Sequence, residues 1–208
     1  MASSVIHMAV ASEINKIIKR NGDKILIGSI APDISKHIGQ TKVKSHFLDE
    51  GSKIPNVNKF LDKYKNNLND DFVMGYFIHL YTDYLWFKYF IPNFYKDDII
   101  TKIDGSLVKC DEETFSNYLY NDYTNLNIKL LDEYNMDLSI FYNEVPNFEN
   151  IIDEIPMDKL SLIIDATGII IENTKVKKYY IFDIECAKKF ILFSTDVILE
   201  KINELLSL

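Results

Sequence analysis

The feature that most constrains this chain is a long apolar run over residues 72–87 that contains His79 and Asp83. A helix that spans a bilayer needs about 20 consecutive apolar residues with few or no charges. Here two ionisable side chains lie inside the run, and Lys88 follows it. Because ionisable groups are costly in a bilayer, we expect this run to form the central helix of a bundle in water.

Apolar side chains recur at steps of three and four residues in several other parts of the chain, which is the spacing of an amphipathic helix. We expect helices over residues 5–18, 57–68, 71–90, 157–172 and 182–206, and short helical segments near residues 115–119, 123–134 and 148–152. The β-branched run at 169–171 leaves a strand as an alternative at that point. These patterns predict an all-α fold, a single-domain helical bundle over residues 1–208.

Two residues in the segment 28–33 are typical of a turn. Gly28 permits unusual backbone dihedrals, and Pro32 disfavours helix at the residue before it. We therefore expect a tight loop here that presents Asp33.

Composition fits one domain with a large core, because 47% of the 208 residues are hydrophobic. The chain has 23 Lys and Arg against 31 Asp and Glu, which gives a formal net charge of −8. This acidic balance repels nucleic-acid phosphates, so we expect no stable complex with nucleic acid. Cys110 and Cys186 show no metal-binding spacing, and no secretory signal is visible, so we expect a cytoplasmic protein.

Histidine and aspartate residues in apolar surroundings are the candidates for chemistry. His79 and Asp83 are four residues apart, so on a helix their side chains lie on one face and can bind one cation. His7 shares a helix face with apolar residues and is expected to point inward, while Asp33 and His46 lie in predicted loops. Taken singly, each of these residues is more simply explained as a hydrogen-bonded core group.

Taken together, the five residues form a coherent set of ligands. His7, Asp33, His46, His79 and Asp83 offer imidazole nitrogen and carboxylate oxygen atoms. Such a set suits zinc, manganese or iron, and does not suit calcium or a soft copper site. The sequence therefore predicts a metal site, with a buried polar network of the same side chains as the alternative.

The segments that carry these residues resemble the zinc-dependent phospholipase C family, which includes fungal single-strand nucleases and many small bacterial hydrolases. The matching segments are Ile6-His7-Met8-Ala9, Ile27-Gly28-Ser29-Ile30-Ala31-Pro32-Asp33, Ser45-His46-Phe47 and Gly75-Tyr76-Phe77-Ile78-His79-Leu80-Tyr81-Thr82-Asp83. They lie within residues 5–90, which is under half of the chain. The segment from Phe182 to Phe190 is also similar to the closing helix of the small bacterial members.

The resemblance implies an all-α bundle whose metal ions lie between helices. It implies one metal site made by Asp33, His46, His79 and Asp83, and a second ion held by His7 and bridged by Asp83. Two departures from the family pattern follow from the sequence. No histidine occurs beyond His79, so a third metal site is not expected, and several residues precede the His7 helix where secreted members use the amino terminus as a ligand. We expect one or two zinc ions.

These expectations lead to a metal-dependent hydrolase that acts on a small phosphoric ester, either a phosphodiester or a phospholipid. Bound zinc lowers the pKa of a coordinated water from about 16 to about 7 and so supplies hydroxide at neutral pH. Asp33 is both a ligand candidate and the expected catalytic proton acceptor. A phosphohydrolase of the HD type is a weaker alternative, because no histidine here is followed by aspartate. A non-catalytic helical protein with a structural metal or a polar His/Asp network is the other alternative.

Several polar residues near these candidates have two possible roles. Lys42 and Lys44 can meet a substrate phosphate as point charges, although solvated loop charges are the simpler interpretation. Glu50, four residues after His46, can orient its ring, or else it is an exposed acid. His37 has polar neighbours and is expected at the surface.

Overall fold

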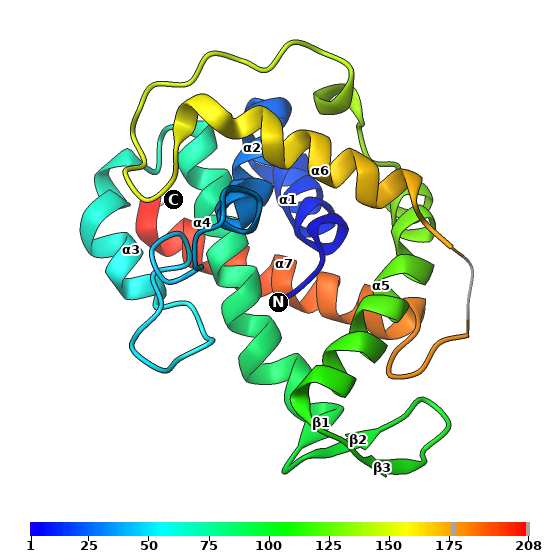
Figure 1. The fold of residues 1–208 in the computed structure, drawn as a ribbon. Helices are drawn as coiled ribbons and strands as arrows, with labels where there is room; N and C mark the ends of the chain where they lie inside the picture. The colour runs from blue at the N-terminus through cyan, green and yellow to red at the C-terminus, as the bar shows by residue number, and fades with distance from the viewer. Residues whose placement is uncertain (176–177, 207–208) are drawn as a thin grey trace.

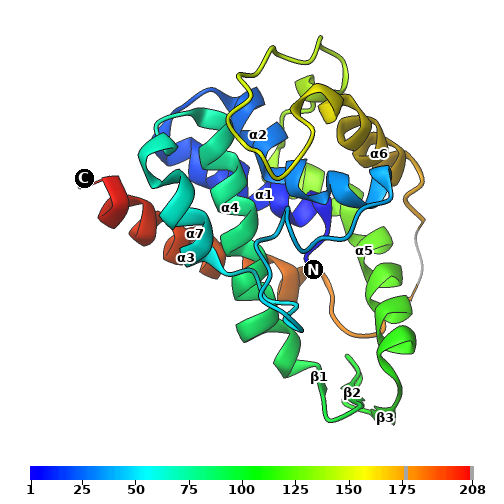
Figure 2. The same cartoon turned by 60° about the vertical axis from the view of Figure 1, so that its left-hand side comes forward.

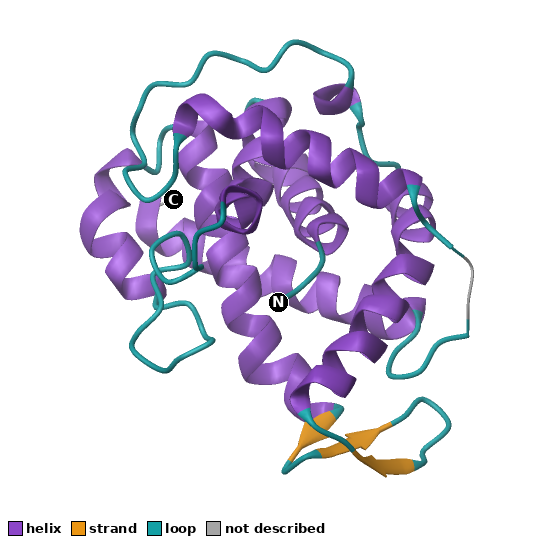
Figure 3. Ribbon diagram, viewed as in Figure 1, coloured by secondary structure: helices purple, strands orange, loops and turns teal. Residues whose placement is uncertain are grey.

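Figure 1 shows the computed structural model of the chain, which describes residues 1–175 and 178–206. Seven α-helices and one small sheet occur in these residues. The helices are α1 (Ser4–Ile18), α2 (Gly22–Ile30), α3 (Val57–Tyr64), α4 (Asp71–Leu85), α5 (Glu112–Tyr134), α6 (Leu160–Glu172) and α7 (Ile184–Leu206). The strands are β1 (Tyr95–Lys96), β2 (Ile99–Thr101) and β3 (Leu107–Lys109). The predicted helical fold is confirmed at this level, and Figure 3 shows how small the strand content is.

The first turn of the central helix, α4, has a side-chain cap, and its last turn is followed by a different helical hydrogen-bond pattern. Asp70 caps the start of α4 by accepting hydrogen bonds from the backbone N–H groups of Phe72 and Val73. After Leu85 the backbone continues as a short π-helical turn, Trp86–Phe90, so the predicted helix over 71–90 is confirmed with a change of hydrogen-bond pattern near its end.

The remaining helices surround α4. Helix α2 packs along α4, and α1 contacts α2, α4, α5 and α7. Figures 1 and 2, which differ by a rotation of 60°, both place the amino-terminal residues between α4 and α5. The buried apolar side chains of these helices form one continuous core. This arrangement brings the start of α1, the end of α2 and the middle of α4 to one point inside the bundle.

The expectation of a loop over residues 28–33 is wrong. Residues Gly22–Ile30 form helix α2, and a 3-10 helix, η1 (Ala31–Ile38), follows it directly. Pro32 lies in the first turn of η1, where its missing N–H is not needed. Gly28 serves a close approach of helices, because a Cβ atom there would lie 2.3 Å from the carbonyl oxygen of Phe72 and 3.0 Å from the Cα of Gly75.

The middle third also differs from the expectation. Residues 112–134 form one continuous helix where two short ones were expected, and residues 148–152 are not helical. The antiparallel sheet β1-β2-β3 was not expected, since its strands are too short to show an alternating pattern. Tyr95 of β1 stacks on Phe115 of α5 with ring centroids 4.3 Å apart, and this contact joins the sheet to the bundle. The run at 169–171 is helical, within α6.

No helix among the described residues is both long and apolar enough to cross a membrane.

Candidate metal centre

The structure brings all five predicted ligand residues together inside the bundle. His7 comes from α1, Asp33 from η1, His46 from the turn that follows it, and His79 and Asp83 from α4. Their exposed fractions are 4% for Asp33, 1% for His46 and 0% for the other three. Residues that are up to 76 positions apart in the sequence therefore share one buried site.

Three of these side chains form the first ligand group. His46 Nε2 lies 3.5 Å from Asp33 Oδ1 and 3.2 Å from His79 Nε2. One ligand atom from each of the three residues lies within 4.8 Å of the other two, which is close enough for all of them to contact one ion.

The second ligand group contains His7, His79 and Asp83. His7 Nε2 lies 3.3 Å from Asp83 Oδ1, while Asp83 Oδ2 lies 3.7 Å from both His46 Nε2 and His79 Nε2. The His7 ring stacks on the His79 ring with centroids 3.8 Å apart. The two oxygens of Asp83 therefore face different histidines, and this carboxylate lies between the two groups.

Several buried polar atoms of the cluster lack a hydrogen-bond partner among the described residues. They are both ring nitrogens of His7 and Oδ2 of Asp83. A buried polar atom without a partner costs about 1–3 kcal/mol. A cation would satisfy Asp83 Oδ2 and a nitrogen of His7 at once, so the residues present fit a metal ion with nitrogen and oxygen ligands.

Backbone and hydroxyl groups orient two of the imidazole rings. His79 Nδ1 lies 2.7 Å from the carbonyl oxygen of Ser29, so Nδ1 carries the proton and Nε2 faces the cluster with its lone pair. His46 Nδ1 lies 2.9 Å from Ser45 Oγ, which in turn accepts a 2.7 Å hydrogen bond from the hydroxyl of Ser35. Partners of this kind hold metal-ligating histidines in one tautomer.

Burial and neighbouring charges act in opposite directions on the two carboxylates. Burial alone would raise the pKa of Asp33, but its hydrogen bond with His46 and the charge of Lys42 hold that pKa well below its ordinary value. Burial would likewise raise the pKa of Asp83, but the neighbouring His7, whose Nε2 lies 3.3 Å from Asp83 Oδ1, lowers that pKa well below the ordinary range. Both carboxylates are therefore ionised at neutral pH.

The same environment keeps two histidines neutral. Burial lowers the pKa of His46 and lowers that of His79 further, with the neighbouring His7 adding to the effect on His79. Metal binding requires ionised carboxylates and neutral imidazoles. These ionisation states are already present at neutral pH.

The polar residues near the ligand candidates are either exposed to solvent or in contact with the centre. His37 is exposed, as predicted, and so is Lys44. Lys42 is not a solvated loop charge, because its ammonium group donates a hydrogen bond to Asp33 Oδ1. Glu50 is exposed and does not orient His46, a role taken by the hydroxyl of Ser45.

Sequence reasoning missed two further contributions to the site. The backbone N–H of Ala2 donates a 2.9 Å hydrogen bond to Asp83 Oδ1, and the hydroxyl of Tyr123 on α5 donates one to the carbonyl oxygen of Met1. No sequence signal marks a backbone donor, whereas Ser45 could have been noticed as the neighbour of His46.

Comparisons with protein-family models, with curated proteins and with solved structures find no match for this chain. The geometry of the five side chains is therefore the basis for a functional proposal.

Proposed function

We propose that this chain is a metal-dependent hydrolase that acts on phosphoric esters. The observation that carries the proposal is the convergence of three histidines and two aspartates in two overlapping ligand groups. Among the described residues, the two buried ring nitrogens of His7 and the buried Oδ2 of Asp83 have no hydrogen-bond partner. Zinc is the proposed ion, with manganese or iron as the other metals that suit these ligands.

The side chains divide into two proposed sets. Asp33, His46, His79 and Asp83 would hold one ion, and His7 would hold a second ion together with Asp83. A bound zinc ion supplies a water of lowered pKa and neutralises charge on phosphoryl oxygens. Asp33 is the more accessible of the two carboxylates, at 4% against 0% exposure, and its ionised state suits it to accept a proton from water.

A second candidate function is a structural metal site or polar network in a non-catalytic helical protein. The observation that favours it is the near-complete burial of the cluster. A surface cavity of about 840 Å³ is lined by residues of the 145–161 segment and by none of the five ligand candidates. A structural site would hold its metal with no coordination position open to water, whereas a catalytic site keeps such a position.

The test begins with protein purified without chelator. Elemental analysis should find one or two equivalents of metal, and chromogenic phosphoric esters should be hydrolysed in proportion to that metal. A ligand in thousandfold excess over its Kd stabilises a folded protein by about 4 kcal/mol, so stripping the metal should lower Tm by about 10 °C. Readdition of zinc should restore both Tm and activity.

Three outcomes are distinguishable. Bound metal with a Tm effect but no hydrolysis would favour the structural site. Absence of metal, together with identical melting curves before and after chelation and after zinc addition, would contradict the hydrolase and the structural metal site and would favour the polar network. Hydrolysis that is unaffected by complete removal of metal would contradict the proposed mechanism.

A further inference from the structure

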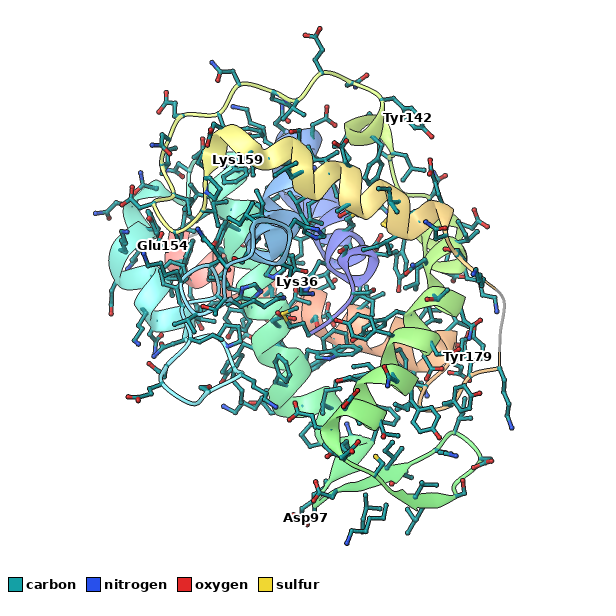
Figure 4. The ribbon with its side chains drawn as sticks, in the orientation of Figure 1. Lys36, Asp97, Tyr142, Glu154, Lys159 and Tyr179 are labelled. Carbon is teal, nitrogen blue, oxygen red and sulfur yellow. The ribbon has the colours of Figure 1, made fainter. Side chains whose placement is uncertain are left out.

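A pocket of about 460 Å³ lies between α7 and the segment of residues 86–94, which joins α4 to the small sheet. Figure 4 marks the turn that follows this segment, between β1 and β2, with Asp97 at the lower edge of the molecule. Five aromatic side chains line the pocket, three from the segment and two from α7: Tyr89, Phe90, Phe94, Phe190 and Phe193. None of the five ligand candidates lines it, so this aromatic pocket is separate from the metal centre.

The floor of the aromatic pocket belongs to the core of the bundle. Phe90 and Phe190 are buried, and their ring centroids lie 5.0 Å apart. Both rings pack on the buried ring of Trp86, at centroid distances of 4.2 Å for Phe90 and 4.9 Å for Phe190. Because packed aromatic rings hold one another in place, the floor is formed before any ligand arrives.

The mouth of the pocket exposes aromatic surface to water. Tyr89 is 49% exposed and Phe193 is 40% exposed, and their ring centroids lie 5.9 Å apart. Burial of apolar surface is favourable, so a molecule with an apolar body that covered these two rings would be stabilised there. Ligand pockets measure about 300–1,000 Å³ and are lined mainly by apolar and aromatic side chains, and this pocket meets both conditions.

One charged side chain, that of Lys189 on α7, lines the pocket, and the other non-aromatic lining residues are the uncharged Asn93 and Cys186. Glu185 precedes Lys189 by four positions, the spacing of a helical ion pair, but its carboxylate lies 3.7 Å from Lys188 Nζ instead. Lys189 makes no ion pair within the part of the chain that the structure describes. A negative group at the edge of the pocket would therefore have an unpaired cation to contact.

We propose that the aromatic pocket binds an amphipathic monoanion, a medium-chain fatty carboxylate. Its alkyl chain would lie against the aromatic rings and its carboxylate would contact the ammonium group of Lys189, a compact point charge. The volume of about 460 Å³ has room for about fifteen water-sized groups at about 30 Å³ each, which accommodates octanoate. A cationic head group would be repelled by Lys189, and the aromatic walls offer little to a fully polar solute.

The first test measures the contribution of the charge. Equilibrium dialysis with radiolabelled octanoate, octanol and octylamine should show that octanoate binds more tightly than octylamine, which is a cation at neutral pH. Lys189→Gln should weaken octanoate binding about three- to fivefold, the range for an exposed ion pair, and leave octanol binding unchanged. The matched control is Lys188→Gln, because Lys188 pairs with Glu133 and Glu185 and does not line the pocket. This variant should bind both molecules as the unmodified protein does.

The second test locates the alkyl chain. Phe193→Ala removes a partly exposed wall of the pocket, so the protein should still fold and should bind both octanoate and octanol about fivefold more weakly. Leu192→Ala is the control, because the neighbouring Leu192 is exposed and does not line the pocket. Circular dichroism melting curves of the variants verify that each is folded.

Three results would overturn the proposal. They are no binding of millimolar octanoate by the unmodified protein, an equal effect of Lys189→Gln on octanoate and octanol, and equal effects of Phe193→Ala and Leu192→Ala. Sedimentation of the unmodified protein tests the other occupant, a second copy of the chain. A dimer that Phe193→Ala dissociates and that octanoate does not would assign the pocket to contact between copies. These measurements need no catalysis, so their outcome is independent of the proposed hydrolase function.

Discussion

Asp83 is the residue on which the arrangement of the centre depends most. Its Oδ1 lies beside His7 and accepts a hydrogen bond from the backbone of Ala2, while its Oδ2 faces His46 and His79. Four segments of the chain are thus connected through one carboxylate. Three imidazole nitrogens lie within 3.7 Å of its two oxygens.

The first prediction concerns the charge of Asp83. Asp83→Asn keeps the shape of the side chain but removes the charge that would bind the ions, so bound metal should fall by at least about half and hydrolysis by more than about tenfold. Helix content, measured by circular dichroism, should be unchanged. Asp196→Asn, which alters an exposed carboxylate on α7, is the matched control and should have neither effect. Equal metal content in the two variants would show that Asp83 is not a ligand.

The second prediction distinguishes one ion from two. His7→Ala should remove one equivalent of metal and leave the ion of Asp33, His46, His79 and Asp83 in place. If His7 is only a core residue, the substitution would leave a cavity and lower the free energy of unfolding by about 1–3 kcal/mol without changing the metal content. Elemental analysis and urea denaturation of the same preparation separate the two cases.

At the scale of elements, the crossing of α2 and α4 determines where the ring of His79 points. Gly28 and Gly75 face each other so closely that a Cβ atom on either would lie 3.0 Å from the Cα of the other. At this crossing the carbonyl oxygen of Ser29 lies 2.7 Å from His79 Nδ1. The absence of side chains at both positions is therefore a requirement of the site as well as of the packing.

The third prediction tests this crossing. In Gly28→Ala the new Cβ would lie 2.3 Å from the carbonyl oxygen of Phe72, so the helices must separate. The free energy of unfolding should fall by about 1–3 kcal/mol, and metal should bind more weakly because the Ser29 carbonyl moves away from His79. Denaturant unfolding and metal titration provide the measurements.

Gly168→Ala in α6 is the matched control for this prediction. A Cβ at Gly168 would make an ordinary 3.6 Å contact with the ring of Phe141. Alanine is favoured over glycine inside a helix by about 1 kcal/mol, so this variant should be as stable as the unmodified protein or more so. If both glycine variants behave alike, the close crossing does not control the site.

At the scale of the whole molecule, the centre makes stability depend on pH. In the folded chain the pKa values of His46 and His79 are lowered from the ordinary value of 6.5, mainly by burial. Below pH 6.5 the unfolded chain therefore takes up protons that the folded chain does not, and the free energy of unfolding falls as pH decreases. The lowered pKa values of Asp33 and Asp83 act in the same direction below their ordinary value of 3.8.

The fourth prediction follows from this sign. Burial also lowers the pKa of the Met1 amino group from 8.0 to about 6. For metal-stripped protein, the free energy of unfolding should therefore begin to fall near pH 8 and then, below pH 6.5, decrease by up to about 1.4 kcal/mol more per pH unit for each of the two histidines. Urea denaturation across the range from about pH 7.5 to about pH 5 measures this slope. His37→Ala should leave the slope unchanged, because His37 is exposed. A flat profile in the same range would mean that the folded and unfolded chains take up the same number of protons. That result would contradict the lowered pKa values of His46 and His79.

Local patterns in the chain predicted most of its helices and the five residues of the centre. The apolar spacing that defines α1, α4, α6 and α7 is a local property, and so is the one-turn relation between His79 and Asp83. Elements without such a pattern were missed. The three strands are two or three residues long, and the single helix α5 has a polar, weakly periodic sequence.

The sequence by itself determined which side chains can ligate a metal and that they lie on apolar helices or next to them. Only the tertiary structure decided the rest. The close crossing of α2 and α4 depends on the facing glycines at positions 28 and 75, and the hydrogen bond from Lys42 to Asp33 depends on how the chain returns after η1. The reason is physical: side-chain periodicity reports the burial of one segment, whereas charge pairing and helix crossing are properties of two segments that the fold has brought together.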